Sequence, residues 1–400
     1  MAAAAALKPE SCPDALHPWQ GRAGAPWFSV RRARSGTDAM RARRGDARLM
    51  GCHGRARLAI AAGIALAALV AAAPAQATFT GSNGRIAFTW SHGGVSDTGP
   101  APHLVGIVSV RPDGGGRRLI VSRGTEPRYS PAGRRIAFMR KQRLWVARAD
   151  GKHARPLTPR GWLVGQHQWS RAGTSLAFIR VSRTSPSHAL YTVRVDGGTP
   201  RRLVKAPTSL SLREGAWSRD GKAIVYTQFR NSGRPLVRVI RSGAITTIVS
   251  LGSMPTWSEQ GVLAYEAPSR GAMLNRVCIR RPRPGVTERC FGFIDAATTN
   301  PVWSPSASHL LFNYTSQVGG GEQTWLVRVD GTVLSRAPGA TAPPPVFSPD
   351  GTLLALSVMS FRGDPRLGYT YLYVRRPDGS DTRLLVRGGQ ATAPDWQPRR

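Results

Sequence analysis

A unit of about 45 residues repeats along this chain and constrains its fold more than any other feature of the sequence. Each copy has an aromatic residue followed by Ser, a short turn that usually contains Gly, and a run of aliphatic, small and aromatic residues. The aromatic positions are 40, 48, 40, 46 and 44 residues apart. This period predicts a β-propeller, in which each repeat forms one blade of four short strands. The aromatic positions are Tyr129, Trp169, Trp217, Trp257, Trp303 and Phe347.

The second half of each unit contains a tight turn, most often an Asp-Gly pair. Such pairs suit the two positive-φ positions of a two-residue β-hairpin. Seven turns of this kind predict an all-β, seven-bladed β-propeller, with six or eight blades as the alternatives. They are Asp113-Gly114, Asp150-Gly151, Asp196-Gly197, Ser242-Gly243, Pro284-Gly285, Asp330-Gly331 and Asp378-Gly379.

The two ends of the repeat region complement each other. Residues 83–88 form the second half of a unit without its aromatic start, whereas Trp396 begins a unit without its second half. We therefore expect the N- and C-terminal strands to pair within one blade, which would close the ring and leave no exposed sheet edge.

The repeat resembles that of TolB-like, WD-type propellers, whose pattern is aromatic-Ser-Pro-Asp-Gly followed by an aliphatic-Ala-aromatic strand. Phe347-Ser348-Pro349-Asp350-Gly351 matches the first half of that pattern in full. The resemblance covers residues 83–398, which is the propeller part of that family and not its N-terminal domain. It implies a fold but no particular role, since function on a propeller resides in loops and channel residues.

Residues 50–77 have the three parts of a secretory signal peptide. Arg55 and Arg57 precede an apolar stretch at 58–73, and small residues end at Ala77. We expect cleavage after Ala77 and export to the periplasm, the cell envelope or the medium; an uncleaved anchor, the one expected membrane contact, is the alternative. Residues 1–49 are expected to be disordered or a mis-assigned upstream extension, and residues 78–400 to form the propeller.

Cys278 and Cys290 are the two cysteines that follow the leader, and they flank a Pro- and Gly-containing turn at nearly equal distances. In an exported protein this arrangement predicts a cross-strand disulfide, with two free buried thiols as the alternative.

The chain is strongly basic, with a net charge of +34, and 51 of its 56 basic residues are Arg. GC-rich codons explain much of this excess, because Ala, Gly and Pro are abundant as well. The alternative is a genuine preference for an anionic partner, since so large a charge steers association. No basic block or nucleic-acid module accompanies the charge, so we expect no specific nucleic-acid partner.

Polar residues near the predicted entries of the innermost strands are candidates for a binding site at one mouth of the propeller channel. For the acidic residues among them, salt bridges with Arg128 and Arg213 are the alternative. His167 is a weak candidate for a metal ligand. We expect no catalytic residue and no cofactor. The candidate binding residues are Glu126, His167, Gln168, Glu214, Asn300 and Asp395.

These features predict an exported, monomeric, non-enzymatic propeller that binds an unknown protein or an anionic envelope polymer at the channel mouth and the loops of one face. The sequence contains no Gly-x-Ser-x-Gly elbow and no phosphate-binding loop. The alternative function is a metal-assisted lyase or hydrolase that acts on anionic glycans.

Overall fold

The computed structural model describes most of the chain from residue 79 onward. The described residues are 79–93, 103–182, 187–212, 216–230, 232, 234–268, 275–281, 288–291, 296–316, 322–338, 345–360 and 368–399. Their regular secondary structure consists of 28 β-strands. The predicted leader, its upstream segment and Glu214 lie outside these residues. No helix within the described ranges has the length and apolar character needed to span a membrane.

Five antiparallel sheets contain four consecutive strands each. The first is β4 (Thr125–Tyr129), β5 (Arg135–Arg140), β6 (Arg143–Arg148) and β7 (Arg155–Pro156). The second is β8 (Leu163–Trp169), β9 (Ser175–Val181), β10 (His188–Arg194) and β11 (Arg201–Ala206). The third is β12 (Leu210–Ser211), β13 (Ala223–Phe229), β14 (Pro235–Arg241) and β15 (Ala244–Val249). The fourth is β16 (Ser253–Trp257), β17 (Leu263–Pro268), β18 (Asn275–Arg280) and β19 (Arg289–Phe291). The fifth is β20 (Ala296–Trp303), β21 (His309–Ser316), β22 (Glu322–Arg328) and β23 (Val333–Pro338).

The remaining eight strands form one larger sheet that joins the two ends of the described chain. Its C-terminal strands are β24 (Val346–Phe347), β25 (Leu354–Ser360), β26 (Tyr369–Arg375), β27 (Arg383–Val386) and β28 (Gly389–Arg399). Its N-terminal strands are β1 (Ser82–His92), β2 (His103–Val110) and β3 (Arg118–Ser122). β28 pairs antiparallel with β1 from Ser82–Arg399 to His92–Gly389, with two register shifts.

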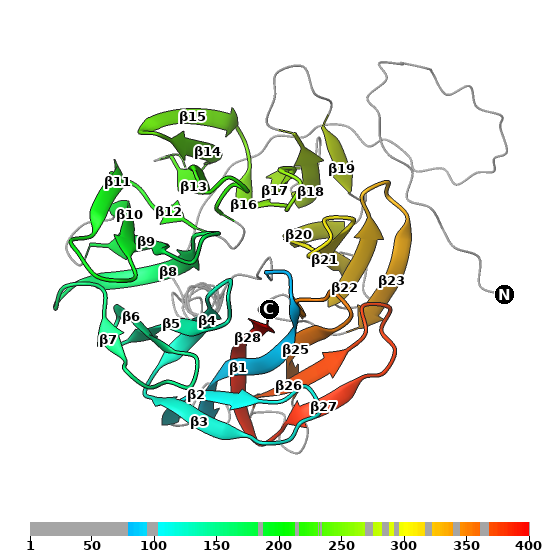
Figure 1. Cartoon of the computed structure of the whole chain (residues 1–400). Coiled ribbons are helices and arrows are strands. Elements are labelled where there is room, and N and C mark those ends of the chain that lie inside the picture. The colour runs from blue at the N-terminus through cyan, green and yellow to red at the C-terminus, as the bar shows by residue number, and fades with distance from the viewer. Residues whose placement is uncertain are drawn as a thin grey trace, which may run out of the picture. The chain divides into compact units, whose positions relative to one another are not determined.

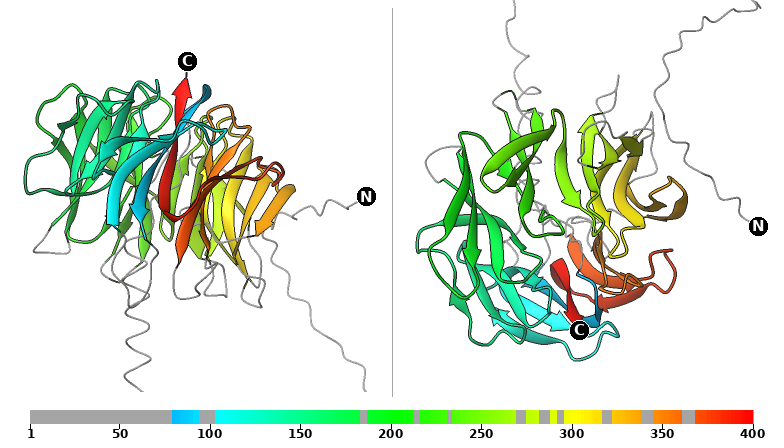
Figure 2. Two further views of the ribbon diagram at one scale, coloured as in Figure 1. Left: turned by 90° about the horizontal axis from the view of Figure 1, so that it is seen from below. Right: turned by 45° about the horizontal axis from the view of Figure 1, so that its top comes forward.

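Figure 1 shows the sheets arranged around a common centre, with β4, β16, β20 and β28 on the inner side and β3, β15, β23 and β27 on the outer side. The other two views, in Figure 2, show the sheets side by side with their strands running across the thickness of the propeller. All-β architecture and the propeller arrangement of sheets are as the sequence predicts.

The tight turn between β6 and β7 needs glycine for a steric reason. Gly151 has φ +85° and lies against the neighbouring sheet, so a Cβ there would stand 1.8 Å from the carbonyl oxygen of Ile120. The side chain of Asp150 accepts a 3.0 Å hydrogen bond from the Lys152 N–H in the same turn. The Asp-Gly pair therefore both forms the turn and permits close packing of adjacent sheets.

Three of the repeated tryptophans tie adjacent sheets together, and all three are buried. The indole Nε1 of Trp169 donates to the carbonyl oxygen of Arg128 at 2.9 Å, and Nε1 of Trp303 donates to that of Thr256 at 3.3 Å. Trp396 makes the same bond to Val346, at 3.1 Å. Each acceptor immediately precedes the aromatic residue of the preceding repeat, so one contact recurs between successive sheets.

Candidate functional site

The innermost strands share an unusual backbone position three residues before the repeat aromatic. Non-glycine residues with φ between 50° and 57° occupy this position in β4, β16, β20 and β28. Strand register shifts beside it in all four strands, which marks a β-bulge. The residues are Glu126, Met254, Asn300 and Ala393.

The bulge residues are held by side chains of the preceding sheet. The N–H of Glu126 donates to Oγ1 of Thr89 at 3.0 Å, and the N–H of Met254 donates to Oγ1 of Thr227 at 3.1 Å. In β20, the N–H of Asn300 donates to Oε1 of Glu266 at 2.8 Å. These bonds connect sheets close to the centre of the propeller and fix the inner strands relative to one another.

Arg128, His167 and Asp395 are buried residues of three sheets, on β4, β8 and β28. Arg128 interacts electrostatically with both of the others. Their exposed fractions are 3%, 2% and 3%. Oδ2 of Asp395, on β28, accepts a 2.5 Å hydrogen bond from the N–H of Tyr129, on β4. Nη1 of Arg128 donates to the carbonyl oxygen of Pro127 at 3.0 Å. The cluster thus connects the C-terminal strand to the first four-stranded sheet.

Burial has the largest effect on the pKa values of the carboxyl groups in and beside this cluster. It raises the pKa of Asp395 to about 7, although Arg128 and the N–H groups of Tyr129 and Trp396 act in the opposite direction. Burial also raises the pKa of Glu126, again opposed by Arg128. Two carboxyl groups around one guanidinium therefore have a weakened tendency to ionise.

His167 is neutral at physiological pH. Burial lowers the pKa of its ring to about 3, with a further contribution from Arg128, and the backbone of Ala137 opposes this shift. Neither ring nitrogen makes a hydrogen bond of normal geometry within the described residues. His167 also belongs to no group of three metal-binding side chains in the part of the chain that the structure describes.

The predicted site residues do not form one open surface. His167, Gln168 and Asp395 are buried, so in this structure they are not exposed at a channel mouth. Glu126 and Asn300 are partly exposed and share the bulge position. A binding role for these residues stays a prediction. The sequence suggests Arg128 only as an ion-pair partner, whereas in the structure it interacts electrostatically with Glu126, His167 and Asp395.

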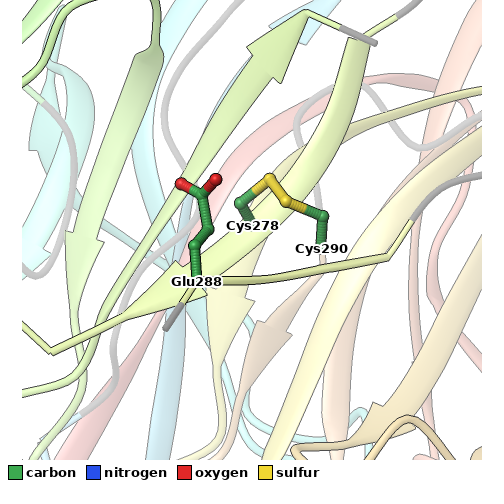
Figure 3. Close-up of side chains that lie close together, drawn as sticks. All are labelled: Cys278, Glu288 and Cys290. Atoms are coloured by element: carbon green, nitrogen blue, oxygen red, sulfur yellow. A yellow bond between two sulfur atoms is a disulfide. The ribbon is translucent and has the colours of Figure 1, made fainter. Parts of the chain in front are cut away.

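The predicted disulfide between Cys278 and Cys290 is confirmed. The two residues are opposite each other on β18 and β19, with an S–S distance of 2.10 Å. Figure 3 shows the carboxylate of Glu288 close to this bond. The three side chains have the spacing of a metal site, but the sulfurs are bonded to each other and are not free thiolates. The disulfide agrees with an exported protein.

Comparison with known proteins connects this fold to TolB and to peptidases. No family model matches the sequence. The uncharacterised peptidase YuxL of Bacillus subtilis (strain 168) is 28% identical over 122 residues, which span 28% of this chain and only 18% of that protein.

Among solved structures, TolB from Acinetobacter baumannii is similar at a TM-score of 0.50, with 16% identity over 86% of this chain and 72% of that one. The chain carries a TolB-like propeller. The propeller domain of the Trilobed protease from Pyrococcus furiosus reaches a TM-score of 0.57, with 14% identity over 77% of this chain and 96% of that domain. Prolyl oligopeptidase B from Galerina marginata reaches 0.55, with 12% identity over 72% and 47% of the two chains.

These comparisons correct the prediction of a non-enzymatic binding propeller. The sequence relative is a peptidase, and peptidases also occur among the proteins with a similar propeller. The structural likenesses by themselves show only that the fold is shared.

Proposed function

We propose that this TolB-like propeller acts in peptide hydrolysis, as the part of a hydrolase that admits and positions peptide substrates. The observation that carries the proposal is the 28% sequence identity to a peptidase over 122 residues. The proposed location is outside the cytoplasm, in keeping with the disulfide.

The proposed ring has seven blades and is closed by the pairing of β28 with β1. Five four-stranded sheets and one eight-stranded sheet account for seven sets of four strands. The Trilobed protease propeller is described as having an open velcro topology. Here β28 and β1 form an antiparallel ladder, and the Asp395–Tyr129 hydrogen bond joins β28 to β4 of the next sheet. Because the seam and the inner strands are fixed in this way, the entrance to the central channel should keep a constant width. Such an entrance would admit short peptides and exclude folded proteins.

The described residues do not show a complete catalytic triad for the proposed hydrolase. One serine–histidine contact occurs within them, between Oγ of Ser308 and Nδ1 of His309 at 2.8 Å. It lies in an exposed turn, where the same hydroxyl also bonds Ser306, and no carboxylate within the described ranges bonds the His309 ring. This pair lacks the third member that orients the base in a serine-hydrolase triad.

Activity measurements on the full chain test this proposal. Extracts of source cells with and without the chain would be given blocked peptides of increasing length, with a fluorophosphonate serine-hydrolase inhibitor as a further arm. We expect inhibitor-sensitive cleavage of short peptides that requires the chain and returns when the purified chain is added back. Ser308→Ala should restore activity as well as the unaltered chain does. Cleavage that is identical with and without the chain would overturn the proposal.

A further inference from the structure

A second feature of the seam is a strongly basic groove on its surface. The groove has a volume of about 590 Å³ and lies between the β1–β28 pair and the first four-stranded sheet. Gln397 and Gly133 connect its two walls through a 2.8 Å hydrogen bond from the Gln397 amide to the Gly133 carbonyl oxygen. The arginines that line it are Arg85, Arg118, Arg134, Arg135, Arg148 and Arg399.

Most of this positive charge has no acidic partner. Asp150 is the one carboxylate among the lining residues, and it interacts electrostatically with Arg148. Arg135 pairs with Asp196 outside the groove. Within the described residues, four other lining arginines make no ion pair with a carboxylate and are exposed; they are Arg118, Arg134, Arg148 and Arg399.

Arg85 is held at the inner side of the groove by the protein itself. Its Nε donates to Oγ of Ser109 at 2.9 Å, and its Nη2 donates to the Ser109 and Gly116 carbonyl oxygens. Burial lowers the pKa of Arg85, and repulsion from Arg118, Arg111 and Arg399 lowers it further. The groove is therefore a place where positive charges are concentrated against mutual repulsion, which an anion would relieve.

A similar groove elsewhere in the propeller contains a carboxylate that balances its positive charge. It has a volume of about 530 Å³ and lies between the third and fourth four-stranded sheets. There Asp220 bonds Arg241, the last residue of β14, at 2.8 Å. The hydrogen bond from Ser218, followed by those from Arg241 and Lys222, lowers the pKa of Asp220, which therefore stays ionised.

The repeat explains why the seam groove lacks this carboxylate. Asp220 occupies the Asp position of the aromatic-Ser-Pro-Asp-Gly pattern, three residues after Trp217. In the two repeats that flank the seam groove, the same position is held by Ala132, after Tyr129, and by Arg399, after Trp396. The position is therefore neutral in one flanking repeat and cationic in the other.

We propose that the seam groove binds a compact ligand that carries several phosphate groups, with Arg118, Arg134, Arg148 and Arg399 as its ligating side chains. Guanidinium groups match the geometry of phosphate oxygens and bind them bidentately. Four such groups around one small groove call for several negative charges close together, which a chain of linked phosphates supplies and a single carboxylate does not. This inference is independent of the proposed function.

Titration calorimetry on the full chain with inorganic tripolyphosphate tests the site, with orthophosphate as a weaker comparison. We expect tripolyphosphate to bind at least about tenfold more tightly than orthophosphate, and its affinity to fall as salt is raised. Ala132→Asp restores the repeat carboxylate opposite Arg148, and should weaken tripolyphosphate binding at least about tenfold. Arg134→Ala should weaken it as well.

The matched control is Ala172→Asp, which makes the same substitution at the same repeat position after Trp169, away from the seam. Ala132 and Ala172 are both exposed, so both variants should keep the melting temperature of the parent. We expect less than about a twofold effect from Ala172→Asp. Equal weakening by both Asp variants would overturn the proposal, because the added charge would then act on tripolyphosphate through a diffuse field. An absence of tripolyphosphate binding would overturn it as well.

A lipid headgroup and a free oligophosphate offer the same chemistry, and a vesicle arm distinguishes them. Binding to phosphatidic acid vesicles that tripolyphosphate displaces would identify a headgroup as an accepted source. Tripolyphosphate binding without vesicle binding would identify a soluble ligand. Vesicle binding that tripolyphosphate does not displace, and that Ala132→Asp does not weaken, would contradict the site.

Discussion

The main-chain N–H of Tyr129 donates a 2.5 Å hydrogen bond to Oδ2 of Asp395, which joins the C-terminal strand β28 to the first strand of the next sheet. The carboxyl group is 3% exposed and interacts electrostatically with Arg128. The seam of this TolB-like propeller therefore contains a buried group that titrates near neutral pH.

Asp395→Asn should flatten the pH dependence of stability. The folded-state pKa of Asp395 is about 7, above its ordinary value of 3.8, so the folded protein retains a proton that the unfolded chain loses. The free energy of unfolding should therefore fall as pH rises from about 4 to 7, by on the order of 4 kcal/mol from this group.

Asparagine can still accept the Tyr129 hydrogen bond but does not titrate. Urea unfolding at several pH values between about 4 and 7 would measure the difference between parent and variant. Other carboxylates contribute equally to both proteins and cancel. A difference that is constant across this range would show that Asp395 ionises normally in the folded state.

His167→Leu should stabilise the protein selectively in acid. The pKa of His167 is about 3 in the folded protein, below its ordinary value of 6.5. Below about pH 6.5 the unfolded chain therefore binds a proton at His167 that the folded protein does not. The parent should lose on the order of 2–3 kcal/mol between pH 6.5 and 4.5 from this group, and the variant should not. His103→Leu, at an exposed position, is the control. Parallel stability profiles of parent and His167→Leu would reject this assignment.

Trp303→Phe should be more destabilising than Trp257→Phe. Both indoles are buried, but Nε1 of Trp303 donates to the Thr256 carbonyl oxygen, whereas Nε1 of Trp257 makes no hydrogen bond within the described residues. The lost bond should add about 1 kcal/mol to the effect of Trp303→Phe. Denaturant unfolding of both variants measures this difference, and equal destabilisation would argue against an energetic role for the bond.

Cys278→Ser combined with Cys290→Ser should lower the free energy of unfolding by about 3 kcal/mol, since the disulfide closes a short loop. Reductant should lower the melting temperature of the parent protein and leave that of the double variant unchanged. If reductant has no effect on the parent, the disulfide does not contribute to its stability.

The sequence predicts those features that depend on the repeat. The repeat period predicts the four-stranded sheets, and the Asp-Gly pairs predict the tight turns. The facing cysteines predict the disulfide between Cys278 and Cys290. Each is a local pattern whose physical cause lies within one repeat. The TolB-like fold follows from the same residues.

The sequence does not reveal which inner-strand residues are exposed. An extra residue at the bulge changes the alternation of side chains, for example between Val164 and His167, so a strict two-residue period misplaces the residues that follow. His167 is buried for this reason and not directed to an open mouth. The lack of a carboxylate beside the basic groove, in contrast, can be read from the sequence, where Ala132 and Arg399 align with Asp220 and Asp350.

Photo-crosslinking from the inner wall tests most directly whether peptides enter the propeller. A benzophenone amino acid would replace Met254, which is partly exposed at the bulge of β16, or Leu119, which is exposed on the outer strand β3. The account predicts saturable crosslinking of short peptides from position 254, little from position 119, and none of folded proteins from position 254. Equal crosslinking from the two positions, or none from position 254, would contradict a role in admitting peptide substrates.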